Sequence, residues 1–563
     1  MTFVAVSIAV ETPGDVGPAI EQARGAVDAG ARLIEWRIDG LANEQQPGEG
    51  PSSGDAMLRL IADGPAPCIV TCRPAWEGGS CEAPEEVRAS LFEAALTADT
   101  PPKYIDVELL AIETPGPVRE VLEQWSAGEL NGAAPDRTGL IVSSHDFEGR
   151  PADLLQRIES AVRLPVGDVL KLAWRARSLR DNLQAFEILA DRHMPTIALC
   201  MGQFGLMSRV LAGKFGGLLT FATTDPENRT ASGQPTVHEL IDRYHADRID
   251  GATRVYGVIG WPVEHSRGPI IHNAGFEATG HNGVYLPLPI PAEYEHFKAT
   301  VAAMLDARFA GGRSLDFRGA SVTIPHKTHL IDFVRESGGT VDDDASAIGA
   351  ANTLVVGDDG SLRCLNTDAR AVVDALCVAM EIDADAIADH RVAILGAGGM
   401  ARASAAAVSR LGAPTVLFNR TPANAAAVAE ALHGRPLQQG QGFTEVAVGD
   451  PASIDCDGFD IIINCTSIGM EGGPMPDASP LDALAGRPVE LTDEIAVLDT
   501  VYTPLRTPLL THARDAGATA IDGRLVFLHQ AARQFEAWVG SPAPLDVFDA
   551  AFNAPEDAGG LLE

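Results

Sequence analysis

Residues 391–403 read RVAILGAGGMARA: an apolar run, a glycine-rich turn and an alanine-rich stretch. Gly396, Gly398 and Ala401 match the pattern G-x-G-x-x-G/A, whose small residues allow a tight turn and a close approach of the backbone to a pyrophosphate. The apolar run predicts a strand over residues 392–395, and the alanine-rich stretch predicts the helix whose N-terminus would meet the phosphates. We therefore expect a Rossmann-like dinucleotide-binding fold around this segment.

The next predicted strand ends in Asn419, Arg420 and Thr421. Arg420 follows the first glycine by 24 positions (420 − 396). An acidic residue there would bind the ribose 2′-hydroxyl of NAD, whereas an arginine suits the 2′-phosphate of NADP. The sequence therefore predicts NADP as the cofactor, with an exposed arginine of no function as the alternative.

Two polar residues upstream of this segment follow predicted strands. Lys327 comes just after the apolar strand in GASVTIPHK, and Asp368 comes at a strand-to-helix turn in CLNTDAR. A lysine and an aspartate beside a nicotinamide can pass a proton to an alkoxide as a hydride reaches its carbon. We therefore expect both residues to be catalytic. Pro287, Pro289 and Pro291 are expected to mark one strand-to-helix turn. The strands predicted in this half cover residues 255–260, 284–288, 320–324, 353–356, 392–395, 415–418, 460–464 and 496–500.

The first half of the chain alternates short β-rich runs with amphipathic helical stretches. Eight strand-helix units in about 245 residues have the size of a closed (β/α)8 barrel, and a doubly wound open sheet is the alternative. The predicted strands cover residues 3–8, 33–39, 68–73, 104–109, 140–145, 169–174, 196–201 and 218–223.

Charged residues recur near the ends of these strands, where barrel enzymes build their active sites. Lys171 lies between apolar residues in DVLKLAW. Burial favours its neutral amine, which can attack a ketone and form a Schiff base, although an aldolase would offer the same feature. His145, one strand earlier, can move a proton near neutral pH, and Glu77 can orient its imidazole. These residues predict proton abstraction α to a carbonyl through an imine. Side chains expected to hold a carboxylate and hydroxyls are Arg37, Arg73 and Arg209.

The composition of the 563-residue chain excludes several classes of function. Lys plus Arg is 42 and Asp plus Glu is 77, a formal charge of −35, which argues against nucleic-acid and anionic-membrane partners because both need a positive surface. Eight scattered cysteines indicate reduced thiols rather than a disulfide framework. No run of about 18 apolar residues predicts a membrane span, and the N-terminus lacks the basic residues of a signal or transit peptide. We expect a cytoplasmic, metal-free enzyme acting on small molecules.

Six motifs of the first half occur together: EWRID, TCRPAWEGG, YIDVEL, VSSHDF, DVLKLAW and MGQFGLMSR. As a set they resemble type I 3-dehydroquinate dehydratases over residues 1–245. The resemblance implies that Lys171 forms the Schiff base with the substrate ketone, and that His145 removes the α-proton and then protonates the departing hydroxyl. Thr230 replaces a serine of the family's Ser-Ala-Pro-Gly-Gln loop and keeps its hydroxyl. The residues implied to bind substrate are Ser7, Glu35, Arg37, Arg73, Arg209, Thr230 and Gln234.

The second half resembles shikimate dehydrogenases over residues 255–538, through motifs that include GVIGWPVEHSRGPIIHNAGF, SVTIPHK, IGAANT, GAGGMARA and VYTPLRTPLL. The resemblance implies that Lys327 and Asp368 are the catalytic dyad. Gly268 replaces the second serine of the family's Ser-x-Ser carboxylate clamp, so either Arg267 compensates or the carboxylate is held more weakly. The residues implied to bind shikimate are Ser266, Thr323, Asn352, Tyr502 and Gln530. Those implied to bind NADP are Gly396, Ala397, Gly398, Gly399, Met400, Asn419, Arg420, Thr421, Thr500 and Gly523.

The two resemblances name consecutive steps of one route, from 3-dehydroquinate through 3-dehydroshikimate to shikimate. The expected organisation is a dehydratase barrel over residues 1–250, a substrate domain over 254–367, a Rossmann-like NADP domain over 368–520 and a returning helical segment over 521–563. One rival is an oxidative quinate/shikimate dehydrogenase using NAD, which Arg420 argues against. The other is a regulatory protein that keeps a pocket without catalysis. Against it stand four retained residues: Lys171, His145, Lys327 and Asp368.

Overall fold

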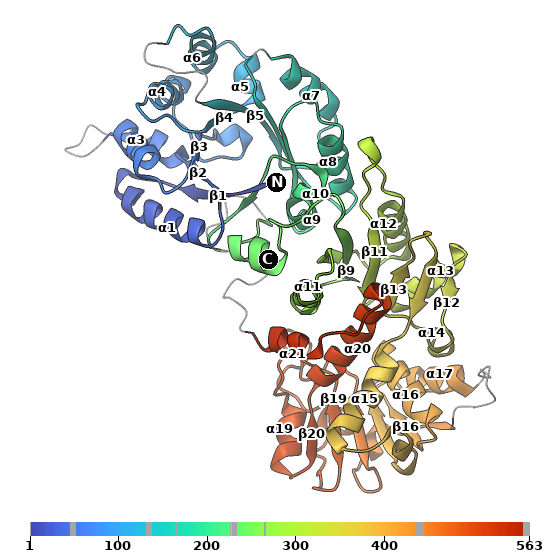
Figure 1. Cartoon of the computed structure of the whole chain (residues 1–563). Coiled ribbons are helices and arrows are strands. Elements are labelled where there is room, and N and C mark those ends of the chain that lie inside the picture. Colours follow the sequence, from blue (N-terminus) through green and yellow to red (C-terminus); the bar gives the residue numbers. More distant parts are fainter. Residues whose placement is uncertain are drawn as a thin grey trace.

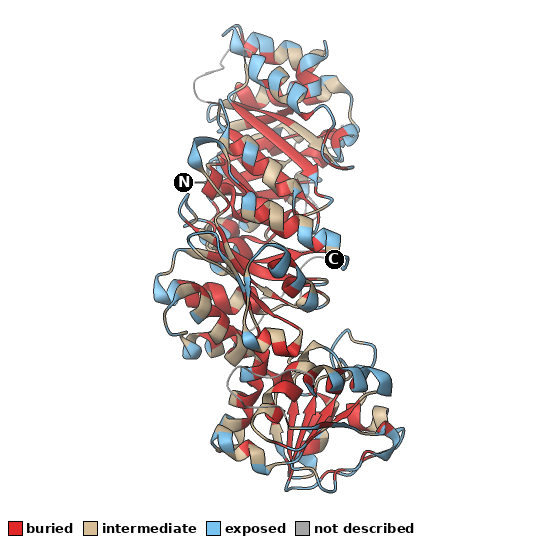
Figure 2. Ribbon diagram, turned by 90° about the vertical axis from the view of Figure 1, so that its right-hand side faces the viewer, coloured by how far each residue is buried: buried red, intermediate tan, exposed pale blue. Residues whose placement is uncertain are grey.

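A computed structural model describes residues 2–44, 52–130, 138–164, 166–225, 227, 233–263, 266–433 and 444–554. Its strands form one sheet of eight and two sheets of six. The eight-stranded sheet lies at one end of an elongated molecule, the first six-stranded sheet in the middle and the second at the other end (Figure 1). Buried residues line the strands of all three sheets (Figure 2).

The eight-stranded sheet is a closed parallel barrel. Its strands follow one another in chain order, β8 pairs with β1, and Leu218 N donates to Thr196 O across the remaining junction of β7 and β8. The predicted (β/α)8 fold is confirmed, and the open-sheet alternative is wrong. The strands are β1 (Phe3–Ala9), β2 (Leu33–Arg37), β3 (Cys68–Thr71), β4 (Tyr104–Glu108), β5 (Gly139–Asp146), β6 (Val169–Arg175), β7 (Thr196–Met201) and β8 (Leu219–Ala222). Helices flanking them are α1 (Val16–Asp28), α2 (Asp39–Asn43), α3 (Ser53–Asp63), α4 (Glu85–Leu96), α5 (Leu109–Glu113), α6 (Pro117–Ser126), α7 (Leu154–Arg163), α8 (Asp181–Ala190), α9 (Leu206–Val210) and α10 (Ala212–Phe215).

The barrel interior changes character along its strands. Near the strand starts it is filled by an apolar cluster that includes Leu33, Ile69, Ile141 and Val169. Two residues further along each of these strands, the side chain that faces the interior is polar or charged. On β6 this residue is Lys171. The apolar layer therefore supports a charged layer at the carboxyl ends of the strands, which is the face where barrel enzymes carry their sites.

The middle sheet is mixed, with strand order β10-β9-β11-β13-β14-β12. Pro287 and Pro289 lie inside its edge strand β10, which pairs with β9 alone, so the expected turn at these prolines is wrong. An edge strand tolerates proline because its outer amides need no partner in the sheet. The strands are β9 (Arg254–Gly260), β10 (Gly283–Pro289), β11 (Phe317–Val322), β12 (Thr340–Val341), β13 (Thr353–Val356) and β14 (Leu362–Leu365). The helices in this stretch are α11 (Gly268–Thr279), α12 (Tyr294–Asp306), α13 (Lys327–Glu336) and α14 (Asp343–Ile348).

The third sheet is parallel, with strand order β17-β16-β15-β18-β19-β20, as a Rossmann-like fold requires. After it, the chain returns to the middle sheet, where Trp538 Nε1 donates to Leu354 O on β13 at 2.9 Å. The strands are β15 (Val392–Leu395), β16 (Thr415–Phe418), β17 (Val446–Val448), β18 (Ile461–Asn464), β19 (Ala496–Asp499) and β20 (Thr519–Ile521). The helices are α15 (Asp368–Met380), α16 (Gly399–Arg410), α17 (Pro422–His433), α18 (Pro480–Ala485), α19 (Pro508–Asp515), α20 (Gly523–Val539) and α21 (Leu545–Asn553).

The barrel and the middle sheet are joined by aromatic contacts. Phe204, after β7, stacks on Trp261, after β9, with ring centroids 6.0 Å apart. Phe309 packs edge-on against Phe186 and Phe215. These contacts hold the two parts against one another. Across the described residues, each helix is too short or too polar to cross a lipid bilayer.

Candidate active sites

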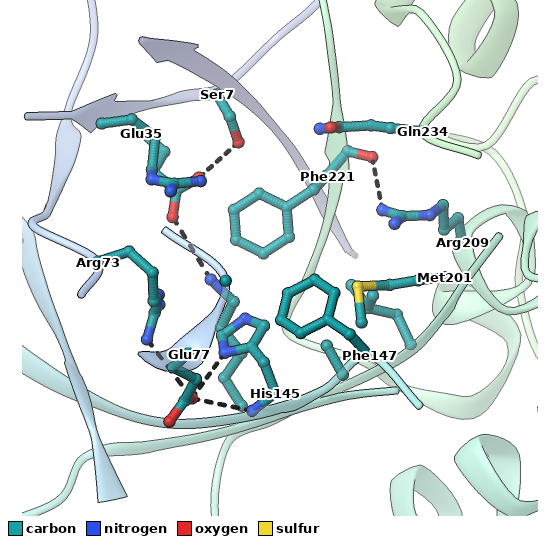
Figure 3. A pocket seen from close by; sticks show the side chains of 15 residues that line it. Ser7, Glu35, Arg73, Glu77, His145, Phe147, Met201, Arg209, Phe221 and Gln234 are labelled. Carbon is teal, nitrogen blue, oxygen red and sulfur yellow. Dashed lines mark hydrogen bonds and ion pairs between the residues drawn. The ribbon is translucent and has the colours of Figure 1, made fainter. Parts of the chain in front are cut away.

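A pocket opens at the carboxyl ends of the barrel strands (Figure 3). His145 faces Glu77 on one side of it, and Arg209 and Gln234 lie on the other. All of the sequence-predicted residues of the first half line this pocket except Thr230, which lies outside the described residues. The lining is Ser7, Glu35, Arg37, Arg73, Glu77, Gly78, His145, Phe147, Lys171, Ala173, Leu199, Met201, Arg209, Phe221 and Gln234.

His145 is held by Glu77 in two ways. Glu77 Oε1 accepts from the His145 backbone N–H and contacts its Nδ1, each at 2.9 Å. Burial, with the positive charges of Arg73 and Lys171, holds the pKa of His145 well below its usual range. Burial raises the pKa of Glu77 to about 7, which the charge of Arg73 opposes. The imidazole is therefore neutral at pH 7 with Nδ1 facing Glu77, which leaves Nε2 as the ring nitrogen away from that carboxyl group.

Lys171 is bonded to carboxylates rather than surrounded only by apolar groups. Its Nζ lies 2.7 Å from Asp106 Oδ2, 3.4 Å from Glu35 Oε1 and 4.3 Å from the ring centre of Phe221. The sequence expectation, which considered only the apolar neighbours along the strand, was therefore incomplete. Alternation along β6 turns those neighbours outward and leaves the amine among charges in the barrel interior.

Asp106 and Glu108 are buried carboxylates that bind the cations of the site, and the sequence analysis assigned neither a role. Arg73 binds both carboxylates, with Nη2 2.6 Å from Asp106 and Nη1 2.9 Å from Glu108. The positive charges of Arg73 and Lys171 overcome the effect of burial and hold the pKa of Asp106 well below its usual range. Their signal in the sequence is two acids at alternate positions in the strand YIDVE, which must share one face of the sheet.

The remaining barrel residues of the pocket are held by hydrogen bonds and one ion pair. Ser7 Oγ donates to Glu35 Oε2 at 2.5 Å, and Thr71 Oγ1 donates to the other oxygen at 2.9 Å. Arg37 pairs with Asp39. Two donors on the far wall are bonded to backbone carbonyls of β8, Arg209 to Phe221 O at 3.4 Å and Gln234 to Ala222 O at 2.8 Å.

A second cluster lies where the middle and third sheets meet. Lys327, the first residue of α13, places Nζ 2.6 Å from Asp368, the first residue of α15. Asn352 Nδ2 donates to the other oxygen of Asp368 at 2.8 Å and lies 3.5 Å from Gln530 Oε1. The structure therefore brings together four of the predicted residues from four separate segments of the chain.

Gly268 lies in the segment that carries the predicted carboxylate clamp, close to Ser266 and Tyr285. A Cβ at Gly268 would stand 3.2 Å from Ser266 Oγ and from the Tyr285 hydroxyl. Arg267 Nη2 donates to Phe552 O and Ala554 O at the end of α21. Thr323 follows β11, and Tyr502 packs on Phe527 of α20 with ring centres 4.7 Å apart.

The glycine-rich turn meets the second cluster directly. Gly396 has φ +114°, which favours glycine, and a Cβ at Gly399 would stand 3.2 Å from the Lys327 side chain. No atom lies within 4 Å of the position that a Cβ would take at Gly398, so a pyrophosphate has room there. Arg420 is exposed and therefore accessible to a 2′-phosphate. The other predicted cofactor residues border this turn, follow β16 or β19, or begin α20; they are Ala397, Met400, Asn419, Thr421, Thr500 and Gly523. In the described residues, no three His, Cys, Asp or Glu side chains are grouped to hold a metal ion.

Comparison with known proteins identifies both halves. The family model of type I 3-dehydroquinase matches residues 4–250, and that of the shikimate dehydrogenase substrate-binding domain matches residues 258–354. The bifunctional 3-dehydroquinate dehydratase/shikimate dehydrogenase, chloroplastic, of Arabidopsis thaliana is 34% identical over 534 residues, covering 93% of this chain and 80% of that protein. The shikimate dehydrogenase (NADP(+)) of Methanothermobacter thermautotrophicus is 36% identical over 304 residues, covering 54% of this chain and 96% of that protein. The solved dehydroquinate dehydratase and shikimate dehydrogenase from S. pombe AroM is 26% identical, covers 98% of each chain and has a TM-score of 0.40.

A barrel with a buried lysine–histidine site, joined to a dehydrogenase with a lysine–aspartate site, defines a lyase–oxidoreductase fusion. The chain belongs to the family of bifunctional 3-dehydroquinate dehydratase/shikimate dehydrogenases. It carries out two steps of the shikimate pathway.

Proposed function

We propose that Lys171 attacks the ketone of 3-dehydroquinate and forms the Schiff base through which water is eliminated. The observation that carries this proposal is a single pocket in which Lys171 and the His145–Glu77 pair face the same space. Arg73 also bonds Asp106, so this carboxylate keeps a cationic partner when the amine loses its proton. The imine draws electrons from the adjacent carbon and makes its proton removable.

His145 is the proposed proton carrier. Its low pKa leaves Nε2 unprotonated at pH 7, ready to take the α-proton, and Glu77 holds the ring from the Nδ1 side. The same nitrogen then returns the proton to the departing hydroxyl. The side chains proposed to bind the substrate carboxylate and hydroxyls are Ser7, Glu35, Arg37, Arg73, Arg209, Thr230 and Gln234.

In the second site, Lys327 is proposed to give a proton to the carbonyl oxygen of 3-dehydroshikimate. NADPH, when bound, supplies the hydride. Asp368 holds the ammonium group beside the glycine-rich turn, and Asn352 fixes the carboxylate. Arg420 is proposed to bind the 2′-phosphate. Shikimate is proposed to contact Ser266, Thr323, Asn352, Tyr502 and Gln530.

The proposed domain limits are 1–250, 254–367, 368–520 and 521–563, the same as those expected from the sequence. A cytoplasmic location is also proposed, supported by eight free cysteines, which suit a reducing compartment. The proposed partners are small molecules only.

Sodium borohydride tests the imine. With 3-dehydroquinate present it should fix a substrate adduct on Lys171, and Lys171→Ala should lose the adduct and the dehydratase activity while still reducing supplied 3-dehydroshikimate. The matched control is Lys214→Ala, because Lys214 is equally buried but bonds only to backbone carbonyls. An adduct that persists in Lys171→Ala would disprove the assignment.

A coupled assay tests the whole sequence of reactions. The chain, given 3-dehydroquinate and NADPH, should produce shikimate with loss of NADPH absorbance at equal molar amounts. A regulatory protein without catalysis would produce neither change. Strong oxidation of NADH with weak oxidation of NADPH would contradict the choice of NADP as cofactor but not the two proposed reactions.

A further inference from the structure

The returning helix α20 brings two glutamine side chains close to Asn352 in the second site. Gln530 and Gln534 are one helical turn apart, and residues at this spacing lie on the same side of a helix. Gln530 Oε1 lies 3.5 Å from Asn352 Nδ2, whereas Gln534 Nε2 donates to the backbone carbonyl of Asn352 at 3.3 Å. Gln534 is only 1% exposed, and its side chain has no part in the mechanism proposed above. A buried amide beside a reacting pair of residues therefore needs an explanation.

Both ends of the Gln534 amide are hydrogen-bonded. Besides the carbonyl of Asn352, Nε2 donates to Thr353 Oγ1 at 3.2 Å, and Oε1 accepts from Ser321 Oγ at 2.7 Å. A backbone carbonyl can only accept a hydrogen bond, so the amide nitrogen of Gln534 must face Asn352 O. The amide oxygen must then face Ser321. The main chain therefore fixes the orientation of this side chain.

The orientation of the Gln534 amide sets the direction of a longer chain of hydrogen bonds. Because Ser321 gives its proton to Gln534, it must accept the proton of the Tyr285 hydroxyl, 2.6 Å away. On the other side, Thr353 accepts from Gln534 and therefore gives its own proton to Asn352 Oδ1, at 2.9 Å. Each hydroxyl has a single proton, so all of these bonds point the same way, from Tyr285 toward Asn352.

The chain of hydrogen bonds ends on the lysine–aspartate pair of the second site. Asn352 Oδ1 also accepts from Thr367 N at 2.8 Å, which leaves Nδ2 to face Asp368 Oδ1, again at 2.8 Å. Lys327 donates to the other oxygen of Asp368. Hydrogen bonds that follow one another in this way polarise and strengthen each other in a buried setting. Gln534 is thus three hydrogen bonds away from Asp368, through Thr353 and Asn352.

We propose that Gln534 is a positioning residue of the dehydrogenase, which acts through Thr353 to hold the Asn352 amide against Asp368. This inference rests on the roles proposed above for Lys327 and Asp368. Without the amide of Gln534, the Thr353 hydroxyl loses its donor and Asn352 loses a bond to its main chain, so the contact between Asn352 and Asp368 is held less firmly. The expected loss is about tenfold in kcat, the factor that corresponds to one hydrogen bond in a protein.

Steady-state kinetics of the full-length chain tests this role with two substitutions and their combination. Gln534→Met keeps the length of the side chain and removes both ends of the amide. It should lower kcat for reduction of 3-dehydroshikimate about tenfold while changing KM far less, the pattern of a group that acts in the transition state. Thr353→Val removes the connecting hydroxyl at nearly constant volume and should have an effect of the same size. The double variant should lose no more than either single variant, because both changes interrupt the same chain of hydrogen bonds.

The matched control is Trp538→Phe, because Trp538 lies one turn further along α20 and donates only to a backbone carbonyl of β13, Leu354 O. It should leave kcat unchanged, and every variant should keep its dehydratase rate and its NADPH binding. An unchanged kcat in Gln534→Met, additive losses in the double variant, or an equal loss in Trp538→Phe would overturn the proposal. If Gln534→Met does not fold, Thr353→Val decides alone, and an unchanged kcat there overturns it. Failure of the proposed proton transfer would instead show as full activity in Lys327→Ala.

Discussion

Replacing Asp106 with asparagine tests how the dehydratase pocket holds its charges. Asp106 is fully buried and bonds Lys171 at 2.7 Å and Arg73 at 2.6 Å. The amide keeps the shape of the carboxylate and removes its charge. Two buried cations would then face one another with Glu35, Glu108 and Glu77 as their remaining anionic partners; Glu77 lies 3.7 Å from Arg73, and Glu35 and Glu108 are already bonded to other groups.

Removing one member of a buried ion pair costs about 3–5 kcal/mol, because the partner stays buried without compensation. A domain of 150–250 residues loses about 2–4 °C of Tm for each kcal/mol. Multiplying these two ranges gives an expected fall of roughly 6–20 °C in the Tm of the barrel. The lowered pKa of Asp106 also predicts that the substitution destabilises the barrel. A carboxyl group whose pKa is lower in the folded than in the unfolded state stabilises the folded state at pH values above its ordinary pKa of about 4, and asparagine lacks this contribution.

The barrel is the part of the protein being tested, and the dehydrogenase activity of the same chain serves as the internal control. Four of the six tryptophans, Trp36, Trp76, Trp125 and Trp174, lie in the barrel, so a tryptophan-fluorescence melt at pH 7 reports mainly on that part. Heat-treated samples should lose dehydratase activity at the lower temperature while dehydrogenase activity survives as in the unmodified protein. A barrel transition within about 2 °C of the unmodified protein would refute the charge argument, because that corresponds to 1 kcal/mol or less.

Three further predictions concern single residues. Lys327→Ala should lower the dehydrogenase kcat far more than it raises KM, and 3-dehydroshikimate should accumulate from 3-dehydroquinate; an undiminished rate of shikimate formation would exclude the proton-donor role. Arg420→Ala should weaken NADPH binding by about 1.5–3 kcal/mol and NADH binding much less, as measured by fluorescence titration; equal losses would make the arginine structural. Burial lowers the pKa of His272 to about 3 in the folded protein. Below about pH 6.5 the unfolded chain therefore binds a proton at this histidine that the folded protein does not bind. Stability should therefore fall as pH drops from 6.5, and His272→Phe should narrow the difference in unfolding free energy between pH 7 and pH 5 by about 2 kcal/mol in urea titrations; an unchanged difference would contradict the pKa shift.

The sequence predicted the strands that are apolar runs and missed four strands of two to four residues. All eight barrel strands were placed, because each is an apolar run of four to eight residues bounded by helical stretches. The strands that escaped prediction, β12, β14, β17 and β20, have two to four residues, and several of these are exposed. Such segments are strands only because a neighbouring strand pairs with them, and that pairing has no local sequence signal.

Site residues were predictable where one side chain carries the chemistry. Lys171 lies within β6, His145 lies near the end of β5 and Lys327 begins α13, and the types of these residues alone suggested the roles proposed for them. Asp106 escaped because its importance comes from meeting Arg73 and Lys171, which lie 33 and 65 positions away in the chain. Only the register of β3, β4, β5 and β6 in the closed barrel brings these three together.

The two lysines proposed to be catalytic are each paired with an aspartate, although different chemistry is proposed for them. Lys171 and Lys327 each contact an aspartate, at 2.7 and 2.6 Å. The second oxygen of Asp106 is bonded to Arg73, a cation that keeps its proton, so this carboxylate stays compensated when Lys171 becomes a neutral nucleophile. The second oxygen of Asp368 accepts from the uncharged amide of Asn352. The two aspartates therefore differ in their second partner, a cation at Asp106 and an amide at Asp368, and this difference accompanies the different roles proposed for the two lysines.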